Sequence, residues 1–342
     1  MTRHRVTIIG LGMALAPHLR SLEELSDRVE IAACFTPDEQ RRAAFAAAHK
    51  HPVSGDLDAI LADKSIDVAF ILTPPNTHLE LVQKCAAAGK HVLMEKPLEA
   101  TAGRALAAVT AMEQAKRKFA IMLQHRFRAA SRKLAGVVES GALGPLISGS
   151  ASIRWWRTPE YFQQPGRGMK ARDGGGVLLT QAIHTLDLFQ SLTGPIAKVT
   201  AFAKTSPQRR IDTEDIVCGG VEFANGAIGA IDATTVAYPG FPERIELACE
   251  KGTAVLNAET LDIHYRDGRH DHQEGAVSKS GGADPMAFSH EAHKALITDF
   301  LDAIDNDREP TVSGREALKV LFLIDALLHS AREQRAVAVS AG

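Results

Sequence analysis

Lys96 has the clearest potential for chemistry in this chain because of the residues around it. It stands in the stretch HVLMEKP (91–97), where an apolar run typical of a buried β-strand is followed by Glu95, Lys96 and Pro97. In open α/β sheets the carboxyl ends of parallel strands border the ligand-binding crevice. A lysine there, beside a proline that fixes the backbone, places one cationic acid–base group over that crevice. The alternative is a strand that ends in a solvated charge pair and a turn, and the order of elements upstream decides against it.

Gly10-Leu11-Gly12 lies between a β-branched run (5–9) and a segment with helical periodicity (13–25). This is the context of a dinucleotide-binding loop. The first glycine permits the tight turn, and the second lets the backbone approach a pyrophosphate at the helix N-terminus. Leu15 occupies the third glycine position, so helix–strand packing must differ there and the motif is weakened. Without its context, Gly-x-Gly indicates a turn and nothing more.

The residue after the second predicted strand (29–35) bears on the choice of cofactor. An acidic residue at this place binds the adenosine ribose of NAD and repels the 2′-phosphate of NADP. Thr36 is neutral and permits the phosphate, and Arg41 and Arg42 lie just beyond it. The alternative interpretation is a capped helix start with a solvated charged face. The choice between NAD and NADP stays open, with a slight preference for NADP.

Strands and helices alternate with short connections through the first third of the chain. The predicted strands are 5–9, 29–35, 68–72, 91–94 and 119–123, and the predicted helices are 13–25, 38–49, 56–63, 77–88 and 101–114. This alternation predicts an α/β domain with a doubly wound parallel sheet, the Rossmann fold, over residues 1–123.

The pattern changes after residue 124. Helices are predicted at 131–140, 174–192, 290–306 and 314–332, and strands at 147–156, 197–204, 216–222, 227–235, 244–247, 253–257 and 261–265. Turns such as Asn225-Gly226 and Asp267-Gly268 suggest hairpins, and residues 271–285 suggest a mobile loop. We therefore expect residues 124–342 to form an α+β domain with a large, mostly antiparallel open sheet, used for substrate binding and oligomerisation.

A second group of candidate residues lies in the later domain. His184 stands on the predicted helix after Gly174-Gly175-Gly176, with Thr180 and Asp187 at helical spacing from it. A lone histidine on a helix is more often structural than functional. The stretch from Arg154 to Asp173 carries aromatic and cationic side chains that can stack on sugar rings and clamp hydroxyls or carboxylates, Trp156 and Arg172 among them. The alternative there is an amphipathic strand and a surface loop.

The order and spacing of these motifs resemble those of the Gfo/Idh/MocA family of NAD(P)-dependent oxidoreductases, which includes glucose-fructose oxidoreductase and inositol dehydrogenase. The resemblance runs over nearly the whole chain. Its motifs are Gly10-Leu11-Gly12 with His18, Thr73-Pro74-Pro75-Asn76-Thr77-His78, Glu95-Lys96-Pro97, Gln124-His125-Arg126-Phe127, Asp173-Gly174-Gly175-Gly176, Gln181-x-x-His184-x-x-Asp187, residues 293–304 and Gly314-Arg315-Glu316.

The resemblance implies roles for individual residues. The cofactor would contact Gly10, Gly12, Met13, Thr36, Thr73, Pro74, Asn76, His78, Glu95, Lys96 and Arg126. Glu95 would help to hold the region of the nicotinamide ribose, and Pro97 would be cis. The substrate would contact Trp156, Arg172, Thr180 and His184.

Lys96 and His184 would be the catalytic residues. Burial and a nearby nicotinamide cation both disfavour an ammonium group and lower its pKa, so Lys96 could take up or return a proton as hydride moves. Many relatives carry Asp four residues before the catalytic histidine, where this chain has Thr180. An Asp–His relay is therefore in doubt, and Lys96 with His184 becomes the expected acid–base pair. Asp187 would either orient the imidazole or face another partner.

The resulting hypothesis is a dehydrogenase or reductase that acts on CH–OH groups. It would transfer a hydride between NAD(P) and a secondary hydroxyl or ketone of a sugar, polyol, sugar acid or related cyclic compound. Two alternatives stay open: an NAD-dependent glycosidase or isomerase that oxidises its substrate transiently, and a non-enzymatic NAD(P)-binding regulator.

Composition limits the possible partners. The 342 residues are 45% hydrophobic and carry a net charge of −2, which does not favour nucleic acid or an anionic membrane as a partner. The four cysteines are scattered, which fits a reducing cytoplasm, and no spacing of metal-binding residues demands a metal. Arg3-His4-Arg5 and the apolar residues after it imitate a signal peptide, but a strand–turn–helix explains them better. A homodimer or homotetramer is the expected assembly.

Overall fold

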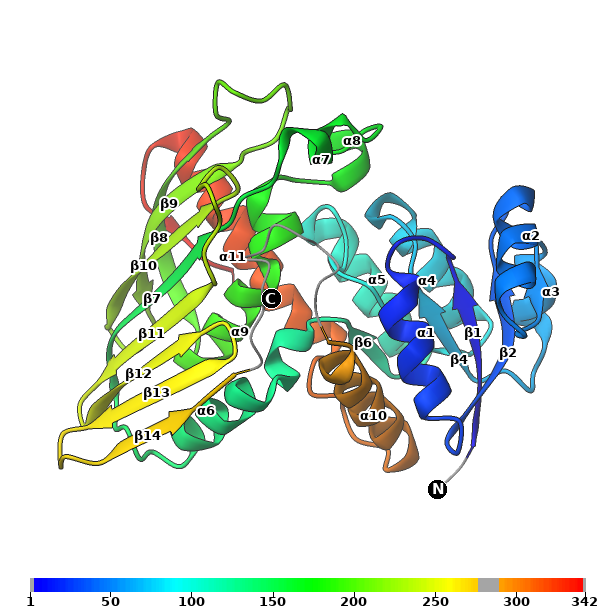
Figure 1. Ribbon diagram of the computed structural model, residues 1–342, viewed down its shortest axis with the longest axis horizontal. Coiled ribbons are helices and arrows are strands. Elements are labelled where there is room, and N and C mark those ends of the chain that lie inside the picture. The colour runs from blue at the N-terminus through cyan, green and yellow to red at the C-terminus, as the bar shows by residue number, and fades with distance from the viewer. Residues whose placement is uncertain (1–2, 276–288, 341–342) are drawn as a thin grey trace. The chain divides into compact units, whose positions relative to one another are not determined.

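The computed structural model describes residues 3–275 and 289–340 and divides the chain into two compact units (Figure 1). The first unit comprises Met1–Met122 with Ser289–Leu318, and the second comprises Leu123–Phe288 with Lys319–Gly342. The sequence had suggested a division after residue 123 that left residues 289–318 in the second domain. Their contacts group them with the first unit, where Glu24 accepts hydrogen bonds from His290 and Lys294.

The first unit is built on a six-stranded parallel sheet with the order β3-β2-β1-β4-β5-β6. Its strands are β1 His4–Ile9, β2 Val29–Phe35, β3 Val53–Ser54, β4 Val68–Ile71, β5 His91–Met94 and β6 Phe119–Ile121. Strands β4, β5 and β6 are buried on both faces, which explains why they appear as continuous apolar runs. The strand order reverses between β1 and β4, the place where doubly wound sheets bind nucleotides.

Helices accompany these strands, and three of them start at a capping side chain. They are α1 Leu15–Glu24, α2 Glu39–Ala48, α3 Leu57–Ala62, α4 His78–Ala87, α5 Ala102–Gln114 and α10 Glu291–Asp305. The side chains of Asp38, Asp56 and Thr101 accept hydrogen bonds from backbone N–H groups in the first turns of α2, α3 and α5. The prediction of a doubly wound parallel sheet is confirmed.

The second unit is built on a nine-stranded sheet with the order β14-β13-β12-β11-β7-β10-β9-β8-β15. Its strands are β7 Leu146–Arg154, β8 Ile196–Lys204, β9 Ile216–Phe223, β10 Ile228–Thr234, β11 Arg244–Cys249, β12 Gly252–Asn257, β13 Thr260–Tyr265, β14 His270–Gln273 and β15 Val337–Ala338. Every neighbouring pair is antiparallel except β7 with β10. The expected large, mostly antiparallel sheet is confirmed.

Helices pack against one face of this sheet (Figure 1). They are α6 Ala129–Glu139, which packs on β12 and β13, and α9 Ile183–Thr193, which packs on β7 and β11. Two short helices, α7 Pro159–Gln163 and α8 Lys170–Asp173, precede α9, and α11 Gly314–Glu333 runs from the last segment of the first unit into the second.

Some elements differ from expectation. The predicted loop at 271–285 is wrong at its start, because residues 271–273 pair with β13 as part of β14. Polar side chains on an exposed edge strand hid it, and residues 276–288 lie outside the described part of the chain. No helix in the described ranges is long and apolar enough to cross a membrane.

Candidate active site

The glycine loop has the geometry that a dinucleotide requires. Gly10 adopts a φ of 105°, and a Cβ there would lie 2.9 Å from the Leu72 carbonyl, so only glycine fits where β1 passes β4. A Cβ on Gly12 would meet no atom within 4 Å, so that backbone faces open space ahead of α1. Met13 beside it is 60% exposed. The loop therefore fits a bound pyrophosphate, with Gly10 closing the turn and Gly12 open to the ligand.

The segment after β4 lies at the same edge of the sheet. Pro74 and Asn76 are exposed, whereas Thr73 is half-buried and its hydroxyl accepts a 2.7 Å hydrogen bond from Thr77. His78 is fully buried. Its Nε2 lies 2.9 Å from the Thr73 carbonyl and its Nδ1 lies 3.0 Å from the Pro97 carbonyl. The structure thus places His78 between the segments after β4 and β5, as a residue that positions both of them.

Glu95 and Lys96 follow β5 at this same edge, and the Lys96–Pro97 peptide bond is cis. The Glu95 carboxylate accepts a 2.6 Å hydrogen bond from His18 Nε2, and its second oxygen accepts the Lys96 backbone N–H at 3.2 Å. Burial raises the pKa of the Glu95 carboxyl. The hydrogen bond from His18 and the charges of His18, His293 and Lys96 outweigh burial, so the net pKa lies below its usual value.

His293 on α10 was not singled out individually from the sequence. Its ring lies edge-on to His18, with 5.4 Å between the ring centroids, and both side chains are buried. The two histidines therefore place positive charge, when protonated, beside a carboxylate next to the candidate catalytic lysine. The sequence did offer one clue to its importance: His293 is the first residue of 293–304, one of the segments that resemble the Gfo/Idh/MocA family.

Thr36 follows β2 and is buried. Arg42 Nη1 donates hydrogen bonds to the carbonyls of Thr36, at 2.9 Å, and Pro37, at 2.8 Å. The guanidinium also packs on Gly55, where a Cβ would approach it to 2.9 Å. A cation is thus fixed at the end of β2, and the residue that follows this strand is the neutral Thr36, not an acidic residue.

The second unit holds the other expected site residues. The His184 ring stacks on His125, with the centroids 4.8 Å apart and the planes at 25°. Arg126, the next residue, makes a two-pronged ion pair with Asp187, at 2.7 Å from Nε and 2.6 Å from Nη2. The short helical segment Gln124–Phe127 thus contacts His184 and Asp187 with consecutive side chains.

The start of the His184 helix is not α-helical. Residues Leu178–Ala182 form a π-helix, so the predicted face shared by Thr180, His184 and Asp187 does not follow from α-helical spacing. Thr180 Oγ1 donates a 2.7 Å hydrogen bond to the Gly176 carbonyl. A Cβ on Gly176 would lie 1.9 Å from the Glu214 carbonyl oxygen, so close packing on Glu214 explains this glycine.

Trp156 and Arg172, the aromatic and cationic residues predicted to bind substrate, are both half-buried. Trp156 packs edge-on against Tyr238 at 5.6 Å, and Arg209 lies 5.8 Å from its ring. Arg172 Nη1 donates a 2.5 Å hydrogen bond to the Pro165 carbonyl. Trp156 and Arg172 thus lie in the same unit as His184, each held by local contacts.

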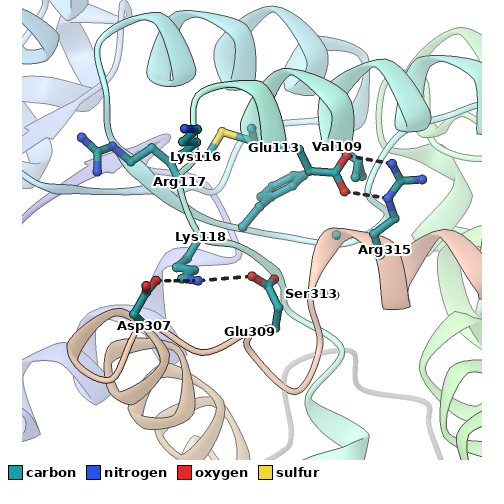
Figure 2. Close-up of a pocket in the computed structure, with 12 residues that line it drawn as sticks. Val109, Glu113, Lys116, Arg117, Lys118, Asp307, Glu309, Ser313 and Arg315 are labelled. Carbon is teal, nitrogen blue, oxygen red and sulfur yellow. Dashed lines mark hydrogen bonds and ion pairs between the residues drawn. The ribbon is translucent and has the colours of Figure 1, made fainter.

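The first unit also has a pocket that none of the expected site residues lines (Figure 2). Lys118 pairs there with Asp307 at 3.0 Å and with Glu309 at 3.3 Å, and Arg315 pairs with Glu113 at 2.6 Å. Phe119, at the start of β6, also lines it. Phe119 begins its strand here, so the pocket lies at the opposite edge of the sheet from the carboxyl ends of the strands, where doubly wound sheets bind nucleotides.

Comparisons with known proteins cover nearly the whole chain. Residues 4–123 match a model described as the oxidoreductase family with an NAD-binding Rossmann fold, and residues 131–255 match the GFO/IDH/MocA C-terminal domain. D-apiose dehydrogenase of Paraburkholderia graminis is 27% identical over 98% of this chain and 89% of its own length. Myo-inositol 2-dehydrogenase of Thermotoga maritima is 27% identical over 97% of this chain and 98% of its own.

Solved structures show the same fold. The WlbA dehydrogenase from Bordetella pertussis, in complex with NADH and UDP-GlcNAcA, superposes with a TM-score of 0.87 at 25% identity, over 99% of this chain and 98% of that one. The chain belongs to the Gfo/Idh/MocA family. It is an NAD(P)-dependent dehydrogenase or reductase that acts on CH–OH groups. The glycosidase, isomerase and regulator alternatives are not favoured.

Proposed function

We propose that this enzyme transfers a hydride between NAD(P) and a secondary hydroxyl or ketone of a sugar, polyol, sugar acid or related cyclic compound. The observation that carries the proposal is the placement of Lys96. It follows β5 at the sheet edge where the Gly10–Gly12 loop and Thr73 follow β1 and β4. The relatives named above, which act on apiose, on inositol or with a nucleotide sugar, support a polyhydroxylated substrate.

A nicotinamide held by these residues would supply the chemistry of hydride transfer at the substrate carbon. Lys96 hydrogen-bonds the hydroxyl on that carbon and takes its proton as the C–H bond breaks. His184 is the second group that takes part in proton transfer. Thr180 has no carboxylate, so it can hold a substrate hydroxyl but cannot serve as a base.

The chain's own residues also suggest how the cofactor is held. Gly10, Gly12 and Met13 would contact the pyrophosphate, and Thr73, Pro74 and Asn76 the adjoining part of the cofactor. Glu95 would hold the nicotinamide ribose region, with His18 fixing its orientation and His78 positioning the loops on either side. Arg126 would act as an indirect support, since its guanidinium is engaged with Asp187.

Arg42 supports a preference for NADP over NAD. A neutral Thr36 does not repel a 2′-phosphate, and the guanidinium held at the Thr36 and Pro37 carbonyls supplies a charge-matched donor beside it.

The test is reduction of NAD or NADP by purified enzyme, followed by the absorbance of reduced nicotinamide, with a panel of sugars, polyols and sugar acids. The proposal predicts net reduction with a compound that carries a secondary hydroxyl. Cofactor binding without net reduction across the panel would contradict it. Arg172→Ala and Trp156→Ala should raise KM for that compound more than they change kcat.

The open face of the nine-stranded sheet supports assembly into a homodimer or homotetramer. Phe202 on β8 and Ile228 on β10 are 69% and 65% exposed. Exposed apolar side chains on a wide sheet face are typical of an interface. Light scattering of the wild type should give a multiple of the chain mass, and Phe202→Asp with Ile228→Asp should lower it. A monomeric wild type would contradict this part of the proposal.

A further inference from the structure

The hairpin of β13 and β14 carries a cluster of metal-binding side chains that the sequence analysis did not single out. The strands are joined through Asp267-Gly268, and their register pairs Asp262 with His272 and His264 with His270. Side chains alternate between the faces of a strand, so these four residues share one face of the hairpin. Leu261, Ile263 and Tyr265 are buried on the other face.

The side chains converge on the Asp262 carboxylate. Its Oδ1 accepts hydrogen bonds from His272 Nδ1 at 2.8 Å and His270 Nε2 at 3.0 Å. The His264 and His270 rings stack at 4.3 Å with an angle of 8° between their planes.

We propose that Asp262, His264 and His270 form a binding site for a divalent transition-metal ion, with Zn²⁺ as the reference ion. The proposal rests on their spacing, because one ligand atom from each of the three residues lies within 4.8 Å of the other two. Tetrahedral zinc with bonds of about 2.0–2.2 Å needs ligand atoms roughly 3.3 Å apart, so small side-chain rotations suffice. Imidazole and carboxylate together suit zinc, copper and nickel better than magnesium or calcium.

His272 orients this site from outside the ligand set. Its Nδ1 contacts Asp262, and its Nε2 lies 3.0 Å from Glu274 Oε2. A carboxylate–histidine–carboxylate chain of this kind fixes the orientation of a ligating oxygen. Solvent would fill the remaining coordination position, because His264, His270 and His272 are exposed.

Two other groups of side chains in the described ranges could compete for the ion. They are His18 with Glu95 and His293, and Glu24 with His290 and Glu291, both in the first unit. In the first of these, Glu95 is already committed to His18 and to the Lys96 N–H. His18 and His293 are buried, which leaves little room for a hydrated ion. In the second, Glu24 is paired with Lys294.

The test is calorimetric titration of the full chain with Zn²⁺, and with Co²⁺ to read the coordination geometry from its visible absorption. The proposal predicts one equivalent of Zn²⁺ bound by the wild type. Asp262→Asn and His264→Ala should each weaken binding by more than about tenfold, since even groups outside the ligand set contribute about 10–100-fold. His329→Ala removes an exposed histidine outside the cluster and should leave binding unchanged.

All three substitutions lie at partly or fully exposed positions, so circular dichroism should show folded variants. Wild-type-like binding in Asp262→Asn and His264→Ala would overturn the proposal, as would absence of binding in the wild type. Loss of binding only in His290→Ala would assign the ion to the cluster around Glu24 and would also overturn it. These outcomes do not depend on dehydrogenase activity, so this inference and the proposed function can fail separately.

Discussion

Arg126 and Asp187 are joined by two hydrogen bonds, from Nε at 2.7 Å and from Nη2 at 2.6 Å, and Asp187 is only 1% exposed. The sequence had suggested that Asp187 would orient His184 or face another partner, and that Arg126 would reach the cofactor. In the structure, each of these two residues has the other as a partner. It also holds residue 126 on the helix that carries His184, while His125 stacks on the His184 ring itself.

We predict that Asp187→Asn lowers the free energy of unfolding by about 3–5 kcal/mol, because it leaves a largely buried guanidinium without its countercharge. Urea unfolding measures the loss. Asp232→Asn is the matched control, since Asp232 pairs with Arg154 at an exposed position and its loss should cost less than about 1 kcal/mol. Equal losses in the two variants would show that burial of the Arg126–Asp187 pair has no effect on stability.

Gly176 is predicted to tolerate no side chain. In Gly176→Ala a Cβ would overlap the Glu214 carbonyl oxygen, and unfolding free energy should fall by about 1–3 kcal/mol or more. Gly136→Ala is the control, because Gly136 lies in α6 and a Cβ there meets nothing within 4 Å. It should stabilise the protein by about 0.5–1 kcal/mol. A Gly176→Ala protein as stable as the wild type would contradict the tight packing.

Local patterns in the sequence predicted some of these features but not others. The apolar run 91–94 and the glycine turn at 10–12 predicted β5 and the nucleotide loop because local periodicity and turn chemistry determine them. The purpose of Gly176 was not predictable, because it depends on Glu214, 38 positions further along the chain. The π-helix at Leu178–Ala182 was not predictable either, since nothing local in the sequence marks it.

Glu95 should make stability depend on pH. Its pKa is lowered in the folded protein, so its contribution is complete above its ordinary pKa of 4.5 and is lost as the pH falls through the lower folded value. The difference in unfolding free energy between wild type and Glu95→Gln should therefore shrink as the pH falls below 4.5. Urea unfolding across this range measures it, with Glu139→Gln on the exposed face of α6 as control. A difference that grows in acid would contradict the lowered pKa.

His18→Gln should act through Glu95 as a positioning effect. Without the 2.6 Å bond from His18, the Glu95 pKa should rise, and the acid limb of the pH profile of kcat/KM should move to higher pH. KM for the cofactor and kcat are measured separately across the profile. A uniform loss of activity with an unchanged profile would indicate a structural role only.

Arg42→Ala should separate the two cofactors. We expect the Kd of NADP to rise on the order of tenfold to hundredfold, because a hydrogen bond to a charged group contributes about 1.5–3 kcal/mol, while that of NAD changes little. Arg41→Ala, one residue earlier and more exposed, is the control. Equal weakening of both cofactors would show that Arg42 only supports the loop.

The sequence predicted where single site residues lie better than it predicted the contacts between them. The positions of Lys96, Thr73 and Thr36 could be predicted, because each follows a parallel strand and the carboxyl ends of parallel strands lie at one edge of the sheet. The contacts of Glu95 with His18, of His78 with Pro97 and of His184 with His125 join segments 19 to 77 positions apart. No local pattern encodes such contacts.

We propose that Lys96 takes the proton while hydride leaves the substrate carbon. The most direct measurement is single-turnover transfer of deuterium from a substrate labelled at its secondary carbinol carbon to NAD(P), in wild type, Lys96→Ala and the exposed control Lys133→Ala. We expect the label on the reduced cofactor, with a rate about 10²–10⁴-fold lower in Lys96→Ala at unchanged cofactor binding. Transfer at the wild-type rate in Lys96→Ala would contradict it.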